Sequence, residues 1–194
     1  MRGLLAMSRF IDRVTAFIGR FVAWLVLAAV VISAGNAILR KAFSISSNAW
    51  LELQWYLFGA VFMMAAAYTL QTNDHIRIDI LYAARSKRTQ DWIDLVGHVL
   101  FLLPFTVLMI WLLSPYVWRS FLSGEVSQNA GGLLLWPAKL MLLAGFTLLF
   151  FQGLSEIVKR IAIMGGLIAD PHRHTGAHAP LEDAALRQGE PGND

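Results

Sequence analysis

Four long apolar stretches alternate with short polar segments along the chain, and this alternation predicts four membrane-spanning helices. The stretches occupy about residues 21–39, 50–72, 95–118 and 136–156. The second of them has no charged side chain between Leu53 and Thr72. About 20 helical residues extend about 30 Å, which is the thickness of a bilayer's hydrocarbon core. The pattern therefore indicates an all-α integral membrane protein in which residues 21–162 form a four-helix transmembrane domain.

The segments outside these stretches differ from one another in their patterning. In residues 1–20, apolar side chains recur at helical spacing with charged side chains between them, which predicts an N-terminal amphipathic interfacial helix. Residues 81–94 mix aromatic, aliphatic and charged side chains in a way that predicts a second surface-lying connector. Residues 163–194 are rich in glycine, proline, histidine and charge, so we expect a disordered cytoplasmic tail there.

Proline, glycine and alanine mark the positions where the helices should bend, begin or pack. Pro104 lies near the centre of the third stretch and predicts a kink. Trp136 and Pro137 predict the start of the fourth span, since tryptophan favours the membrane interface and proline the first helical turn. Gly59 and the alanines after it predict close packing of the second span. Residues 126–135 should form a packed loop or a short re-entrant segment.

The composition narrows the classes of function. Hydrophobic residues make up 57% of the 194 residues and charged residues 15%, as in membrane proteins. The chain has no cysteine, which excludes disulfides, thiolate metal sites and covalently attached c-type haem. Its basic residues flank the apolar runs instead of forming a separate patch, so we expect contacts with membrane lipids and none with nucleic acid.

The basic residues also predict the orientation of the chain in the membrane. Of the sixteen lysines and arginines, twelve precede the first span, lie between the second and third, or follow the fourth. Cytoplasmic segments of membrane proteins are enriched in these residues. We therefore expect both termini in the cytoplasm. The four basic residues on the opposite side are Arg40, Lys41, Arg119 and Lys139.

Glu52 is the sharpest candidate for a specific contact, because it is an ionisable residue at the mouth of a span. It lies in the first turn of the second span, where the helix dipole stabilises an anion. A structural role would pair it with Arg40 or Lys41 at the same surface, and the alternative is a contact with a partner protein. Trp50, two residues earlier, has the position of an interfacial anchor.

The remaining polar candidates give no sign of catalysis. His75, Arg77 and Asp79 follow the second span, where they could be solvated or could fix the adjoining loop. His98 has no second histidine within a predicted span, so this chain alone cannot assemble a bis-histidine haem site. The sequence contains no hydrolase, zinc-protease, P-loop or dinucleotide-binding motif. We therefore expect no enzymatic activity, no cofactor and no bound metal.

Several segments together carry a family resemblance that extends over about residues 10–162. They are the end of the first span at residues 40–43, Glu52 with its glycine- and alanine-rich span, residues 75–79, and residues 124–161 with Trp136 and Pro137. In these features the chain resembles the small membrane subunit, of DctQ type, of tripartite ATP-independent periplasmic (TRAP) transporters.

The resemblance implies a scaffold function in the bacterial inner membrane. In this family a large subunit holds the substrate and sodium sites and moves like an elevator, a periplasmic binding protein delivers the solute, and the small subunit braces the large one. The Trp136-Pro137 variant is similar to members often grouped with carboxylate, mannitol or chloroaromatic uptake, and of these we expect the solute to be an organic acid taken up with a cation. The candidate subunit-interface or structural residues are Arg40, Trp50, Glu52, His75, Arg77, Asp79, Trp136 and Pro137.

Two other functions remain open from the sequence. A membrane-anchor subunit of a redox complex would require paired intramembrane histidines or a partner that carries the cofactor. An absorbance scan of the purified chain would detect a bound haem. An autonomous small transporter would show internal repeats, or uptake in liposomes that contain this chain alone. The sequence contains no repeat at a fixed period.

Overall fold

The computed structural model describes residues 2–44, 47–73 and 85–168, which form helices apart from short connections and one isolated β-bridge. The helices are α1 (Arg2–Phe43), α2 (Asn48–Thr72), α4 (Lys87–Gly97), the π-helical turn η1 (His98–Leu102), α5 (Leu103–Ser123) and α6 (Trp136–Met164). Within the described chain, four helical runs are long and apolar enough to cross a membrane: α1, α2, α4 to α5, and α6. The structure therefore confirms an all-α membrane protein.

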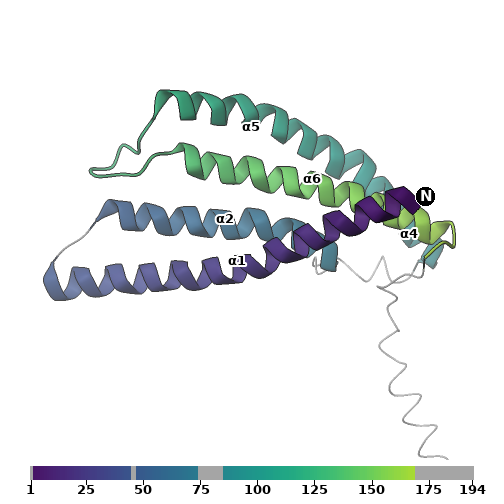
Figure 1. The fold of residues 1–194 in the computed structure, drawn as a ribbon, viewed down its shortest axis with the longest axis horizontal. Helices are drawn as coiled ribbons and strands as arrows, with labels where there is room; N and C mark the ends of the chain where they lie inside the picture. Colours follow the sequence, from purple (N-terminus) through teal and green to yellow (C-terminus); the bar gives the residue numbers. More distant parts are fainter. Residues whose placement is uncertain (1, 45–46, 74–84, 169–194) are drawn as a thin grey trace, which may run out of the picture.

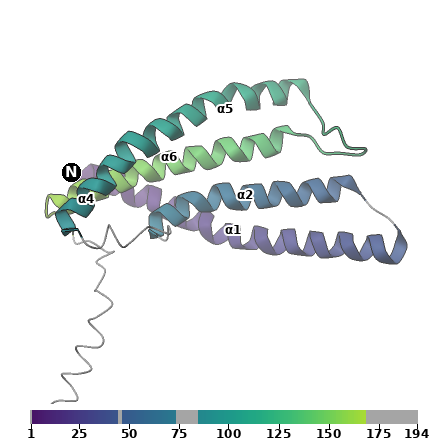
Figure 2. The same cartoon turned by 180° about the vertical axis from the view of Figure 1, so that it is seen from behind.

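The four long helices lie side by side in a single layer, in the order α1, α2, α6, α5 (Figures 1 and 2). The start of α1 also contacts α6, so α1 crosses its neighbours at an angle. One end of the layer, called the loop end below, holds residues 124–135, the end of α1 and the start of α2. The opposite end, called the terminal end, holds α4, the beginning of α1 and the end of α6.

The α1 helix joins two segments that the sequence pattern separates, because residues 2–43 form one uninterrupted helix. Large apolar side chains of its first half face outward, with Phe10 66% and Phe17 67% exposed. The buried side chains are smaller and recur every seven residues, close to two helical turns, which keeps one narrow stripe against the neighbouring helices. The buried positions of this stripe are Ser8, Thr15, Val22, Ala29 and Asn36.

Small residues bring α2 and α6 into close contact. A Cβ atom on Gly145 of α6 would lie 2.6 Å from the Cβ atom of Met63 on α2, so only glycine fits there without a shift. On α2 itself, Ala60 and Ala67 are buried, which confirms the predicted packing face. Gly59 is not part of this contact, since a Cβ atom there would meet nothing within 4 Å.

The predicted kink near Pro104 takes the form of a π-helical turn followed by a bent α5 (Figure 1). Proline has no backbone N–H and cannot continue the regular hydrogen-bond ladder. Directly before it, the N–H of Leu103 bonds to the carbonyl of His98, five residues back. The helical run from α4 through η1 into α5 is otherwise continuous, so the predicted surface connector leads directly into the third span.

Candidate functional site at the loop end

Three polar side chains from the first turns of α2 hold the loop of residues 124–135. Asn48, Glu52 and Tyr56 are spaced four residues apart and therefore share one face of the helix. The Asn48 amide donates to the carbonyl of Ala130 at 3.0 Å, and the Tyr56 hydroxyl donates to the carbonyl of Leu134 at 3.1 Å. The start of α2 thus contacts both the tip and the returning side of the loop.

Glu52 lies between these two contacts and is buried. Its Oε1 atom accepts hydrogen bonds from the Ser127 hydroxyl and from the Asn129 amide, the latter at 2.7 Å. Its Oε2 atom accepts from the backbone N–H of Leu133 at 2.7 Å. Hydrogen bonds to an ionised oxygen are shorter and stronger than neutral ones. One carboxylate therefore joins both arms of the loop to α2.

The loop has its own backbone pairing as well. The N–H of Ser127 donates to the carbonyl of Leu133 at 2.9 Å, and Val126 and Leu134 form an isolated antiparallel bridge. Figure 1 shows residues 124–135 extending beyond the ends of α5 and α6 instead of folding back between the helices. Of the two predicted forms, the structure therefore has the packed loop.

The prediction that Glu52 forms an ion pair with Arg40 or Lys41 was wrong. Loop donors occupy both carboxylate oxygens, and Arg40 is exposed in the last turn of α1. The sequence reasoning missed Ser127 and Asn129 as partners because they lie far from Glu52 along the chain. The available signal was a polar, glycine-rich segment between two apolar helices on the side of the membrane where Glu52 lies.

A second carboxylate fixes the base of the loop. Glu125 accepts hydrogen bonds from the amine of Lys139 in α6 and from the hydroxyl of Ser120 in α5. These hydrogen bonds, chiefly the one from Lys139, lower the pKa of Glu125 below its ordinary value. The same amine lies 3.9 Å from the centroid of the Tyr116 ring, a cation–π contact. Lys139 therefore makes its contacts within the protein.

The other predicted site residues have varied positions. Trp50 is 45% exposed, and Trp136 is half-buried with its ring edge-on to Phe121 at 5.4 Å between centroids. Pro137 lies in the first turn of α6, as predicted. The remaining three predicted residues, His75, Arg77 and Asp79, lie outside the described residues.

At the terminal end, Arg160 attaches α4 to α6. Its guanidinium lies 2.9 Å from Asp91 and 2.7 Å from Asp94, both of them buried. Sequence reasoning missed this cluster, although two acids three residues apart share one face of a helix and were a signal for a shared cation. The pairing holds α4 against the last turns of α6.

Polar side chains also join the start of α1 to α6. The hydroxyls of Ser8 and Ser155 are 2.7 Å apart, and Thr15 donates to Gln152 at 2.8 Å. The Gln152 amide in turn donates to Asp12 at 2.9 Å. Four of these five side chains are buried, and each is paired, as buried polar groups generally are. The buried polar groups thus serve helix packing.

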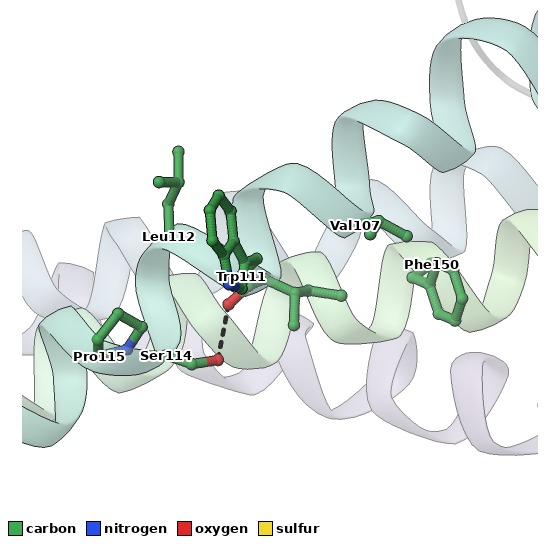
Figure 3. A pocket seen from close by; sticks show the side chains of 7 residues that line it. Val107, Trp111, Leu112, Ser114, Pro115 and Phe150 are labelled. Carbon is green, nitrogen blue, oxygen red and sulfur yellow. Dashed lines mark hydrogen bonds between the residues drawn. The ribbon is translucent and has the colours of Figure 1, made fainter.

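Away from these contacts, an apolar groove of about 700 Å³ lies on α5 beside Phe150 of α6 (Figure 3). Trp111 and Pro115 line it, and the hydroxyl of Ser114 donates to the carbonyl of Ile110 at 2.6 Å. The groove therefore presents apolar walls. In the described part of the chain, no three His, Cys, Asp or Glu residues are arranged to hold a metal ion.

The sequence of this chain matches a known protein family. A family model described as "Tripartite ATP-independent periplasmic transporters, DctQ component" matches residues 29–162. The chain belongs to the DctQ family. No curated protein and no solved structure gives a match. The match confirms the resemblance noted in the sequence and makes this DctQ protein the small subunit of a TRAP transporter, a transport component and not an enzyme.

The family match covers most of the features described above. It includes Glu52, the whole loop of residues 124–135 and the Arg160 cluster, and it begins within α1. The contacts of Ser8, Asp12 and Thr15 with α6 therefore involve a part of this DctQ chain that precedes the matched region.

Proposed function

We propose that this DctQ subunit is a non-catalytic scaffold in the bacterial inner membrane. It braces the large, elevator-type subunit of a TRAP transporter during cation-coupled uptake of a solute, in our proposal an organic acid, which a periplasmic binding protein delivers. The observation that carries the proposal is the layer of helices (Figures 1 and 2), which exposes many large apolar side chains and in which polar side chains tie neighbouring helices together.

A brace must resist deformation while its partner moves, and the contacts of this chain suit that task. Gly145 allows α2 and α6 to touch closely, Glu52 attaches the loop to α2, and Arg160 attaches α4 to α6. Because each contact joins elements distant in sequence, the layer is linked at its centre and at both ends. Its exposed apolar side chains suit contact with lipid or with a partner's transmembrane helices.

The proposed orientation puts the terminal end at the cytoplasm and the loop end at the periplasm. It is supported by the excess of basic residues in the segments assigned to the terminal end. In this orientation Trp50, Glu52 and the loop of residues 124–135 lie on the side from which a periplasmic binding protein docks. A rigid, partly exposed loop there is suited to contact such a partner.

Purification of the tagged full-length chain from its native membrane in a mild detergent tests the scaffold function. We expect a much larger polytopic membrane protein to accompany it at near one-to-one ratio in mass spectrometry. Cells that lack the chain should lose uptake of the solute while the binding protein still binds it. Recovery of a stable, monodisperse chain without a partner would contradict the proposal, as would uptake by liposomes that contain this chain alone.

A further inference from the structure

The α4 helix has an unusual distribution of charge. Its two acids, Asp91 and Asp94, are buried against Arg160, whereas Trp92 is 51% and Val96 42% exposed. Apolar side chains therefore point away from the protein, and acidic ones point into it. An apolar helix face that is turned outward at the end of a transmembrane layer is suited to a lipid boundary and not to water.

The exposed charge at this helix is entirely positive. Arg88 shares one face of α4 with Trp92 and Val96, because the three residues are spaced four apart. Arg85 is exposed just before the N-cap residue, Ser86, at the same end of the helix. Because Asp91 and Asp94 are buried and paired with Arg160, and Asp91 also with Lys87, no exposed carboxylate of α4 competes for a bound anion.

We propose that this face of α4 is a docking surface for anionic phospholipids. Arg85 and Arg88 bind the headgroup phosphates, and Trp92 and Val96 lie among the first atoms of the acyl chains. Tryptophan favours this depth because its ring is apolar and its N–H is polar, and arginine pairs with phosphate through two hydrogen bonds. The lipid anchors the terminal end of the helix layer at the membrane surface.

Lipid selectivity of the full-length chain tests this proposal. The purified protein is reconstituted in phosphatidylcholine bilayers with a trace of spin-labelled phosphatidylglycerol or phosphatidylcholine, and the motionally restricted fraction gives the relative association constant. We expect the wild-type chain to prefer phosphatidylglycerol, and the preference to weaken at high salt. In R85Q/R88Q it should fall by about five-fold or more, since one arginine near an anionic surface contributes about 1 kcal/mol.

Two further variants serve as controls for charge and for position. R85K/R88K keeps the charge and should keep most of the preference. R119Q removes an exposed arginine from α5 near the loop end and should leave the preference unchanged. Equal selectivity in R85Q/R88Q and wild type would overturn the proposal, as would an equal loss in R85K/R88K. If R85Q/R88Q instead lost the co-purifying large subunit with its lipid selectivity intact, the surface would be a protein interface.

Discussion

The backbone N–H of Leu133, in the loop between α5 and α6, donates a hydrogen bond of 2.7 Å to the carboxylate of Glu52 in α2. The carboxylate oxygen accepts this hydrogen bond in the way that a backbone carbonyl of a neighbouring strand would in a β-sheet. Because the same carboxylate also binds Ser127 and Asn129 on the other arm, it sets the position of the loop relative to α2.

Glu52→Ala should therefore release the loop without unfolding the helices. The donors of Ser127, Asn129 and Leu133 would lose their acceptor, and unpaired donors favour local opening. We expect backbone hydrogen exchange in residues 126–134 to become on the order of tenfold faster. Complex yield or solute uptake should also fall if a partner contacts the loop.

Gln128→Ala is the matched control for this change, because Gln128 is exposed in the same loop. It should leave the exchange rates close to those of the wild type. Unchanged exchange in Glu52→Ala would show that Glu52 does not hold the loop. Unchanged assembly and uptake, with faster exchange, would separate the structural role of Glu52 from transport.

The close contact between α2 and α6 gives a prediction with an internal control. Gly145→Ala places a Cβ atom 2.6 Å from the Met63 side chain and should cost about 1–3 kcal/mol of unfolding free energy, as overpacking does. Gly59→Ala adds the same atom where nothing lies within 4 Å, and alanine favours a helix by about 0.5–1 kcal/mol over glycine. Denaturation of both variants in mixed detergent micelles should show opposite shifts; equal shifts would contradict the close contact.

Arg160→Met should loosen α4, because Asp91 and Asp94 would lose the buried guanidinium that links them to α6, while Asp91 keeps its partner Lys87 at 3.7 Å. The loss of one partner from a buried ion pair costs about 3–5 kcal/mol. We expect a lower thermal unfolding midpoint by circular dichroism and faster labelling of a single cysteine introduced at Leu95. The triple variant R160M/D91N/D94N also removes the two negative charges, so its unfolding midpoint should be higher than that of Arg160→Met. If Arg160→Met were as stable as wild type, the cluster would not hold α4.

The pKa of Glu125 predicts how the loop responds to acid. Lys139 and Ser120 lower this pKa in the folded loop relative to the opened loop. The contribution to stability is therefore fully present above the ordinary pKa of about 4.5, and it is lost as pH falls through the lowered value. Hydrogen exchange of residues 124–135, corrected for its intrinsic pH dependence, should accelerate over this range. In Glu125→Gln the acceleration should be smaller, because the Glu52 carboxylate that also holds the loop is still present. An unchanged acceleration would assign it to a group other than Glu125.

The sequence predicted most of the helices because their apolar runs are long and their boundaries carry clear signals. Pro137 begins α6 as expected, and Pro104 accompanies a bend. Contacts between helices were harder to predict, because in a membrane both the lipid and the helix interface accept apolar side chains. The apolar periodicity of residues 1–20 therefore described the exposed side of α1, while the buried side carried Ser8 and Thr15.

The contacts of the candidate site were also difficult to predict from the sequence. Glu52 was recognised because a charge at the mouth of a span is rare, and a basic partner was expected because Arg40 and Lys41 were predicted to lie at the same surface. Its actual partners are neutral donors on a distant loop, including a backbone N–H. A backbone donor carries no residue-specific signal, so only the folded arrangement of the helices could identify it.

The orientation in the membrane can be tested because the chain has no cysteine of its own. Single cysteines at Gln128 in the loop and at Thr89 in α4 lie at exposed positions on opposite ends of the layer. If the excess of basic residues at the terminal end sets the topology, an impermeant maleimide should label Gln128→Cys on intact spheroplasts. It should label Thr89→Cys only after the membrane is permeabilised. The reverse pattern would place the loop of residues 124–135 in the cytoplasm, where Glu52 could not contribute to docking of a periplasmic binding protein.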